Sequence, residues 1–307
     1  MAEQQPLKSF LEYVNQVQPE GEDEQKLPTI MVAAFEGWND AGEAATSALN
    51  GLVFAMEATL RTRIKDKDYY DYQFVRPVAM RRNGRLVHVW PQTDFYLAKF
   101  TAADGQDWQL LLATGQEPNF RWREFCADVL TVAADHNVKG LIVLGAALAE
   151  VPHTRATPAT ITSEDAQLRA GVGATESDYE GPTGITGILA YTASQAGLPT
   201  LSMWAQVPAY VSQPPVPKAT LSLLRRLEQQ LGLHFDTHEV EEDSNAWMRG
   251  VAKLMEEDED LAAYVAELEH AADTDTVAES SGDIIAQEFE RYLRRRQGGS
   301  GTDSDQS

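Results

Sequence analysis

The residues best suited to chemistry lie in a polar turn that follows the first apolar segment of the chain. The run Thr29 to Phe35 is rich in β-forming apolar residues, which favours a short buried strand. It leads into five turn residues, Glu36, Gly37, Trp38, Asn39 and Asp40. Apolar residues recur at helical spacing from Ala44 onward, so we expect a helix directly after the turn. Carboxylates and an amide beside the N–H groups of a helix N-terminus could bind a small ligand or orient a water molecule.

The same turn also has a purely structural interpretation. Asp40 and Glu43 have the spacing of a capping box, in which Asp40 would cap the helix. Asn39 would then hold the turn, and Trp38 would pack on the sheet. For Glu36 the ligand-binding and structural roles both stay open. A turn this acidic is a poor phosphate site, because anions are bound where backbone N–H groups meet no negative charge.

A second polar group follows the apolar strand expected at Gly140 to Leu144. In this loop, His153 and Arg155 could bind a carboxylate or a phosphate, or His153 could act as a base. Alternatively, side-chain hydrogen bonds simply lock the loop. Because the loop and the Glu36 turn each leave the end of a predicted strand, they could face each other across a crevice.

A third group lies near a predicted helix start and consists of Glu117, Arg121 and Arg123. Its side chains have opposite charges at short spacing, which favours ion pairing over catalysis. We expect these residues to pair with Glu36 or with a neighbouring subunit.

A fourth group is the Gly/Pro turn Tyr179 to Gly184, which leads into another predicted helix. Thr183 is expected to cap that helix, and Glu180 lies where the backbone could approach a ligand closely. The turn is not a P-loop, because no Gly-Lys-Ser/Thr follows it. The sequence also contains neither a G-x-S-x-G nucleophile elbow nor a G-x-G-x-x-G fingerprint.

Metal and thiol chemistry have weak support. His234 and His238 have a spacing that binds zinc on a helix, but no third strong ligand lies nearby, so we predict neither a metal nor a cofactor. Cys126 is the single cysteine, which excludes an intramolecular disulfide. Its place on the apolar face of a predicted helix favours a buried structural thiol over a nucleophile.

Charge narrows the classes of partner. The net charge is −22, and residues 234–307 contribute −14, with 20 Asp/Glu against 6 Lys/Arg. We therefore expect binding to neither nucleic acid nor an anionic membrane, since both need a basic surface. No apolar run reaches the roughly 20 residues of a membrane span, and no signal peptide is recognisable. These features predict a cytoplasmic protein.

The expected elements describe an α/β fold. Strands alternate with helices from Gly115 to Leu231, which is typical of a mostly parallel sheet covered on both faces. Tyr69 to Val75 is predicted as a second strand. Asn83-Gly84 and Asp104-Gly105 indicate two hairpins before the alternating region, which make the sheet mixed. The prediction is a three-layer α/β/α sandwich.

Four regions follow from composition: an N-terminal arm (1–26), the α/β/α core (27–235), an acidic helical extension (236–297) and a disordered tail (298–307). The extension is expected to contain three helices. The last of them, Asp283 to Arg296, is amphipathic and must bury its apolar side against the core or another chain.

Four segments carry a resemblance to a known family: EGWNDAGEAA (36–45), EPNFRWREF (117–125), VKGLIVLGAALAEVPHTR (138–155) and YEGPTGITGILA (179–190). In this order they resemble the proteasome assembly chaperone 2 family, specifically its bacterial, actinobacterial-type branch. The resemblance spans roughly Leu27 to Leu231. It implies an α/β/α sandwich similar to the nucleoside phosphorylase fold, and an assembly role based on protein contacts.

Two functions compete. The first is a non-catalytic, chaperone-like binding protein, with proteasome subunits as one partner class, that forms a homo-oligomer such as a trimer. The second is a nucleosidase- or phosphorylase-type enzyme, or a small-molecule binder, in the crevice at the Glu36–Asp40 turn; this rests on fold analogy alone. Convergence of the candidate side chains on one pocket would favour chemistry, whereas a pocket filled by Trp38 or by a neighbouring subunit would favour binding.

Overall fold

The computed structural model describes residues 7–17, 26–65, 67–156 and 158–274. Within these ranges the main sheet has seven strands in the order β2-β5-β6-β1-β7-β9-β8. Its strands are β1 (Thr29–Glu36), β2 (Thr59–Ile64), β5 (Thr93–Thr101), β6 (Asp107–Gln116), β7 (Val138–Ala149), β8 (Thr160–Thr162) and β9 (Thr200–Pro208). The four central strands β6, β1, β7 and β9 run parallel, and antiparallel pairs lie toward both edges. The sheet is therefore mixed and mostly parallel, as predicted.

Strand β1 is the centre of the molecule. Every residue from Thr29 to Phe35 is buried, because parallel neighbours flank the strand and helices cover both faces. Ile30, Val32 and Ala34 point to one hydrophobic cluster. Met31, Ala33 and Phe35 point to the other. Successive residues of the strand thus point alternately into two hydrophobic cores. Because both faces are buried, the sequence of the strand is an unbroken apolar run.

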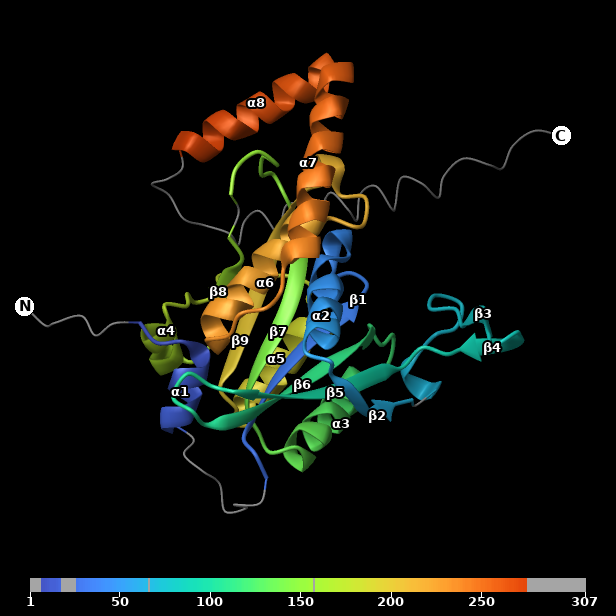
Figure 1. Cartoon of the computed structure of the whole chain (residues 1–307), viewed down its shortest axis with the longest axis vertical. Coiled ribbons are helices and arrows are strands. Elements are labelled where there is room, and N and C mark those ends of the chain that lie inside the picture. Colours follow the sequence, from blue (N-terminus) through green and yellow to red (C-terminus); the bar gives the residue numbers. More distant parts are fainter. Residues whose placement is uncertain (1–6, 18–25, 66, 157, 275–307) are drawn as a thin grey trace, which may run out of the picture.

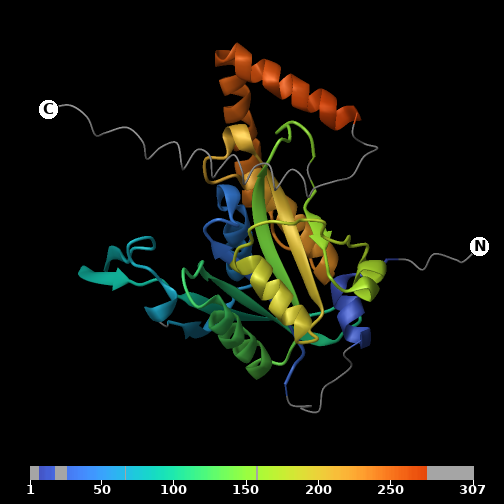
Figure 2. The ribbon, with the colours of Figure 1, turned by 180° about the vertical axis from the view of Figure 1, so that it is seen from behind.

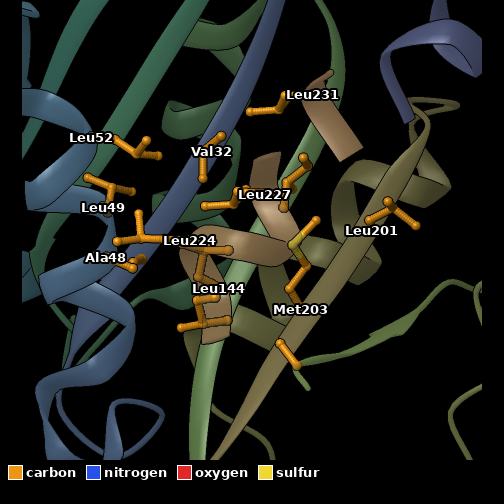
Figure 3. Packing of buried hydrophobic residues seen from close by; sticks show 14 of the residues in the cluster. Val32, Ala48, Leu49, Leu52, Leu144, Leu201, Met203, Leu224, Leu227 and Leu231 are labelled. Atoms are coloured by element: carbon orange, nitrogen blue, oxygen red, sulfur yellow. The ribbon is translucent and has the colours of Figure 1, made fainter. Parts of the chain in front are cut away.

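Helices cover both faces of the sheet (Figure 1). They are α1 (Phe10–Val17), α2 (Ala44–Ala55), α3 (Trp122–Asp135), α4 (Ala166–Val172), α5 (Ile185–Gln195), α6 (Pro217–Leu231), α7 (His238–Glu257) and α8 (Glu259–Thr274). Helices α2 and α6 pack together on the first face, where Leu49 of α2 and Leu227 of α6 belong to the same cluster as Val32 (Figure 3). Helices α3 and α5 cover the second face (Figure 2). This three-layer arrangement confirms the predicted fold.

The N-terminal helix α1 packs on the core. Phe10 and Val14 are fully buried, and a Cβ built on Gly140 of β7 would lie 2.8 Å from the Phe10 ring. The missing side chain at Gly140 therefore makes room for this helix. Part of the segment predicted as an N-terminal arm (1–26) thus forms a helix that packs on the core.

The C-terminal helices α7 and α8 extend beyond the sheet (Figure 1). Val240 and Trp247 of α7 pack against the α2/α6 cluster, so the extension begins in contact with the core. The amphipathic helix predicted at Asp283 to Arg296 and the tail at 298–307 lie outside the described residues.

One predicted strand is wrong. Tyr69 to Val75 contains no strand; a 3₁₀ helix at Lys67–Tyr69 and turns occupy this region, and the second strand is β2 at Thr59–Ile64. Tyr69 is buried, and its ring lies 5.3 Å from that of Phe125 in an edge-on contact. Tyr69, one of the aromatic residues that suggested a strand, instead packs on Phe125 near the start of α3.

Both predicted hairpins are confirmed. Strands β5 and β6 form one of them within the main sheet. Strands β3 (Val78–Arg82) and β4 (Arg85–Val89) form the other, joined at Asn83 and Gly84, and they make a separate two-stranded sheet. We call residues 74–93 the arm. Because the arm connects β2 to β5, it projects from the β2 edge of the main sheet (Figure 1).

Candidate functional site

The turn after β1 is held tightly against the neighbouring strand. Gly37 has φ +124°, a conformation that L side chains rarely adopt, and a Cβ at this position would meet the Glu117 side chain. Asn39 is buried, and its carbonyl accepts a hydrogen bond of 2.8 Å from the Ala146 amide. The turn that the sequence singles out is therefore rigid and integrated into the sheet.

Asp40 caps helix α2, although not through a capping box. Its carboxylate accepts hydrogen bonds from the backbone amides of Ala45 at 2.7 Å and Thr46 at 3.2 Å, and from the Thr46 hydroxyl. Glu43 takes no part in capping; it adopts a left-handed conformation, φ +53°, between a short 3₁₀ turn and α2. Burial raises the pKa of Asp40, and its hydrogen bonds partly oppose that shift.

Glu117 joins three elements at the carboxyl edge of the sheet. Its carboxylate accepts a hydrogen bond of 2.8 Å from the Ile185 amide at the start of α5 and one of 3.4 Å from the Asn39 side chain. Its own amide donates to the Glu36 carbonyl at 3.0 Å. Burial raises the pKa of Glu117, and hydrogen bonds from the Ile185 and Trp38 amides lower it. Glu117, which directly follows strand β6, thus provides an acceptor at the N-terminus of α5.

The prediction that Thr183 caps α5 is wrong. The N-cap residue is Gly184, and the helix has no cap from a local side chain. A Cβ at Gly184 would lie 1.9 Å from the Asn39 side-chain nitrogen and 2.8 Å from Glu117. The absent side chain lets these two groups reach the helix start, so the cap comes from Glu117 instead.

Glu36 and Arg121 do not form the expected ion pair. Glu36 accepts a hydrogen bond from Gln116, and burial followed by the nearby charge of Asp40 raises its pKa. Arg121 pairs with Asp68 at 3.5 Å and Glu124 at 3.6 Å. The two predicted groups therefore have separate roles.

His153 and Arg155 belong to a different environment, against the C-terminal helices. Only 3% of His153 is exposed, and its Nδ1 lies 2.7 Å from the Tyr210 hydroxyl. Burial, together with the charge of Lys218, lowers the pKa of His153. The lowered pKa disfavours the imidazolium form of His153, which is the form that would attract an anion.

Arg155 fastens the same loop to α8. Its guanidinium makes two bonds of 2.8 Å to Asp273 and approaches Glu269 at 3.5 Å. Lys218 donates to the backbone carbonyls of His153 and Arg155. The alternative in which side-chain hydrogen bonds lock this loop is the one that the structure supports.

A cleft of about 1130 Å³ is lined by residues of α5, β9, β8 and the turn after β1. Its floor includes Thr160, Thr162, Ser202 and Trp204, and its walls include Trp38, Tyr179, Tyr191, Glu164, Glu176 and Asp178. Of the residues selected from sequence, Trp38, Asn39 and Thr183 line it. Glu36, Asp40, Glu117, Arg121, His153, Arg155 and Glu180 do not. The candidate catalytic groups therefore do not converge on one pocket.

Sequence reasoning missed the floor of this cleft. Along β9, Leu201, Met203 and Ala205 are buried, whereas Ser202 and Trp204 alternate with them and are partly exposed. This period-two pattern could have indicated that one face of the strand lacks a full apolar cover.

Neither metal ligands nor a membrane segment is found in the described part of the chain. No group of three or more His, Cys, Asp or Glu side chains there is arranged to hold a metal ion. None of its helices is both long and apolar enough to cross a membrane.

The fold and the sequence define a known family. The family model described as PAC2 family matches residues 34–255, most of the chain. A PAC2 family protein of known structure from Streptomyces avermitilis is 41% identical, with a TM-score of 0.72; the match covers 77% of this chain and 99% of that one. This chain therefore belongs to the PAC2 family, which confirms the resemblance seen in the sequence.

Two further solved structures are informative. A proteasome-assembly chaperone homologue from Mycobacterium tuberculosis is 41% identical, with a TM-score of 0.69 and coverage of 77% of this chain and 99% of that one. A Pyrococcus furiosus archaeal proteasome activator is 17% identical, with a TM-score of 0.58 and coverage of 76% and 96%, and shares the fold. A comparison with curated proteins finds no match.

Proposed function

We propose that this protein is a non-catalytic, chaperone-like assembly factor whose partners are proteins, with proteasome subunits as the partner class. Membership of the PAC2 family supports this proposal. So does the relative that is 41% identical over nearly its whole length and is described as a proteasome-assembly chaperone homologue. A cytoplasmic location, as the sequence predicts, is part of the proposal.

The observation that carries the proposal is that the polar groups at the carboxyl edge of the sheet already have structural roles. Asp40 caps α2, Glu117 caps α5, and Arg155 holds α8. A nucleosidase or phosphorylase would need an anion or water site beside a free carboxylate. Lys, Arg and His are absent from the described residues that line the cleft, and the Arg169 guanidinium beside it is already paired with Glu176, so a phosphate would find little positive charge there.

The test is purification of the tagged chain from its native cells, with protein and metabolite mass spectrometry on the same eluate. Stoichiometric recovery of proteasome subunits is the expected result. Recovery of a nucleoside or phosphate ester, with no stoichiometric protein, would overturn the proposal in favour of the enzyme alternative.

The acidic tip between α7 and α8 offers a way to locate the contact. Glu256, Glu257 and Glu259 are all exposed there. Their combined replacement by Gln should reduce recovery of the partner if it binds the extension. The matched control, Glu57→Gln with Asp104→Asn and Glu124→Gln, makes the same change of charge at exposed sites elsewhere and should leave recovery unchanged.

A further inference from the structure

The arm exposes large apolar side chains, of which Trp90 makes an edge-on ring contact with Tyr72 at 5.0 Å. Its strands form an isolated two-stranded sheet, and every residue of β3 is exposed. Val78, Leu86 and Trp90 are 58%, 60% and 53% exposed. A lone two-stranded hairpin is at best marginally stable in water, and clustered exposed apolar residues mark interaction sites. These features point to a surface that another molecule covers.

The arm is also the basic part of an acidic protein. Residues 74–93 contain four arginines and no Asp or Glu, in a chain of net charge −22. Arg81, Arg82 and Arg85 surround the hairpin tip and are exposed. No carboxylate among the described residues lies within ion-pair distance of these three or of Arg76. The occupant of this surface should therefore be acidic and partly apolar.

The cleft beside α5 has the complementary character. Trp204, Tyr179 and Tyr191 supply aromatic surface, and Glu164 and Asp178 supply exposed carboxylates. Among the described residues, neither carboxylate is paired with a Lys or Arg. Glu176 also lines the cleft, but Arg169 pairs with it at 3.1 Å. A concave, acidic and aromatic surface therefore stands open on the same chain that carries a basic, apolar arm.

Topology places these two features at opposite edges of the sheet. The arm leaves between β2 and β5, and β2 is one edge strand. The cleft is lined by residues of β9 and β8. Strand β8 is the other edge strand of the sheet (Figure 1). Strands β3 and β4 point away from the main sheet (Figure 1). The arm therefore does not lie over the cleft of its own chain.

We propose that the arm of one copy inserts into the α5–β9–β8 cleft of a second copy. The contact joins two different surfaces, so it closes as a reciprocal dimer when the rotation between copies is two-fold, and as a larger ring such as a trimer at a smaller rotation. This proposal goes beyond the proposed function and does not depend on whether proteasome subunits are the external partner.

The first experiment is site-directed cross-linking between two differently tagged variants, Arg82→Cys on the arm and Asp178→Cys in the cleft. A short bismaleimide should link the two polypeptides only when the variants are mixed. The native thiol provides little background, since Cys126 is buried and burial raises its pKa to about 11. Linking of Arg82→Cys to itself, or no linking in the mixture, would overturn the proposal.

The acidic extension is the competing surface, and a third variant tests it. Glu259→Cys at the start of α8 is exposed and lies within an acidic run. It should give no cross-link with Arg82→Cys. A cross-link to Glu259→Cys in place of Asp178→Cys would move the contact to the extension and refute insertion into the cleft.

The second experiment measures mass in solution by light scattering during size-exclusion chromatography. The wild-type chain should be a closed oligomer, and the combined Arg81→Glu, Arg82→Glu and Arg85→Glu variant should dissociate at least about 100-fold more readily, because like charges then face each other. The control variant, with Glu at Arg123, Arg249 and Lys253, changes the charge equally at other exposed sites. A monomeric wild type, or equal effects of the two variants, would refute the proposal.

A charge exchange separates loss of contact from loss of folding. Replacing both Glu164 and Asp178 by Arg should also disrupt the oligomer. Mixing this variant with the arm variant that carries Glu at its three tip positions should restore a mixed oligomer, because each arm again meets a cleft of opposite charge. Two variants that are each folded but do not assemble on mixing would count against insertion of the arm.

Discussion

Replacement of Glu117 by Ala tests whether the carboxyl edge of the sheet is held by side-chain acceptors. The change removes the acceptor for the Ile185 amide at the start of α5, a helix without a local cap. Loss of an N-terminal cap costs about 0.5–2 kcal/mol, and a buried donor left unpaired adds about 1–3 kcal/mol. The free energy regained by no longer burying a carboxylate offsets part of this. We therefore expect a net loss of about 2 kcal/mol.

The assay is thermal unfolding followed by circular dichroism, with denaturant unfolding as a second measure. A loss of about 2 kcal/mol corresponds to a fall in Tm of roughly 4–8 °C for a domain of this kind. Glu117→Gln should lose less than half as much, because the amide oxygen still accepts one hydrogen bond. The control Glu124→Ala removes an exposed carboxylate whose ion pair spans 3.6 Å, and should lie within about 0.5 kcal/mol of wild type. If Glu117→Ala has the same Tm and free energy of unfolding as the control, Glu117 does not stabilise the start of α5.

Three further outcomes follow from the packing and the pKa directions. Gly145→Ala should destabilise the folded protein by about 1–3 kcal/mol, because the new Cβ would lie 2.6 Å from the Trp204 ring. Gly51 lies inside α2 with open space around it, so Gly51→Ala should stabilise the folded protein by about 0.5–1 kcal/mol in the same unfolding assay. Iodoacetamide at pH 8 should leave Cys126 unlabelled until the protein is unfolded, as mass spectrometry can show, since the thiol is buried and its pKa is raised to about 11. Because folding raises the pKa of Glu117, protonation of this side chain stabilises the folded state. That contribution is fully present below the unfolded pKa, near 4.3, and is lost as pH rises through the folded pKa. Unfolding titrations should therefore show Glu117→Gln gaining less stability than wild type when pH is lowered from 7 toward 5.

The sequence predicted local elements well wherever one pattern decided the outcome. The unbroken apolar run of β1 requires cover on both faces, and both faces are covered. The Asn83-Gly84 pair requires a tight hairpin, and positive φ values at both residues provide it. In each case the determining interaction lies within a few residues of the pattern that reveals it.

Prediction failed where a partner lies far along the chain. Thr183 has the side chain of a good helix cap, but the cap of α5 comes from Glu117, on a different element. His153 and Arg155 have the side chains of an anion site, but Tyr210 and Asp273 occupy them. Nothing in the spacing of these residues reveals such contacts, because only the folded sheet brings the groups together.

The distribution of occupied and open polar groups bears on the choice between catalysis and assembly. Catalysis needs groups that converge and remain free to exchange protons with a substrate. Here the buried carboxylates at the sheet edge hold helix starts, and two exposed acids of the cleft, Glu164 and Asp178, are paired with no Lys or Arg among the described residues. The arm carries exposed positive charge, but at the opposite edge of the sheet, away from the cleft of its own chain. The two open surfaces thus satisfy each other between molecules, which is how an assembly protein, and not a single-chain active site, would be arranged.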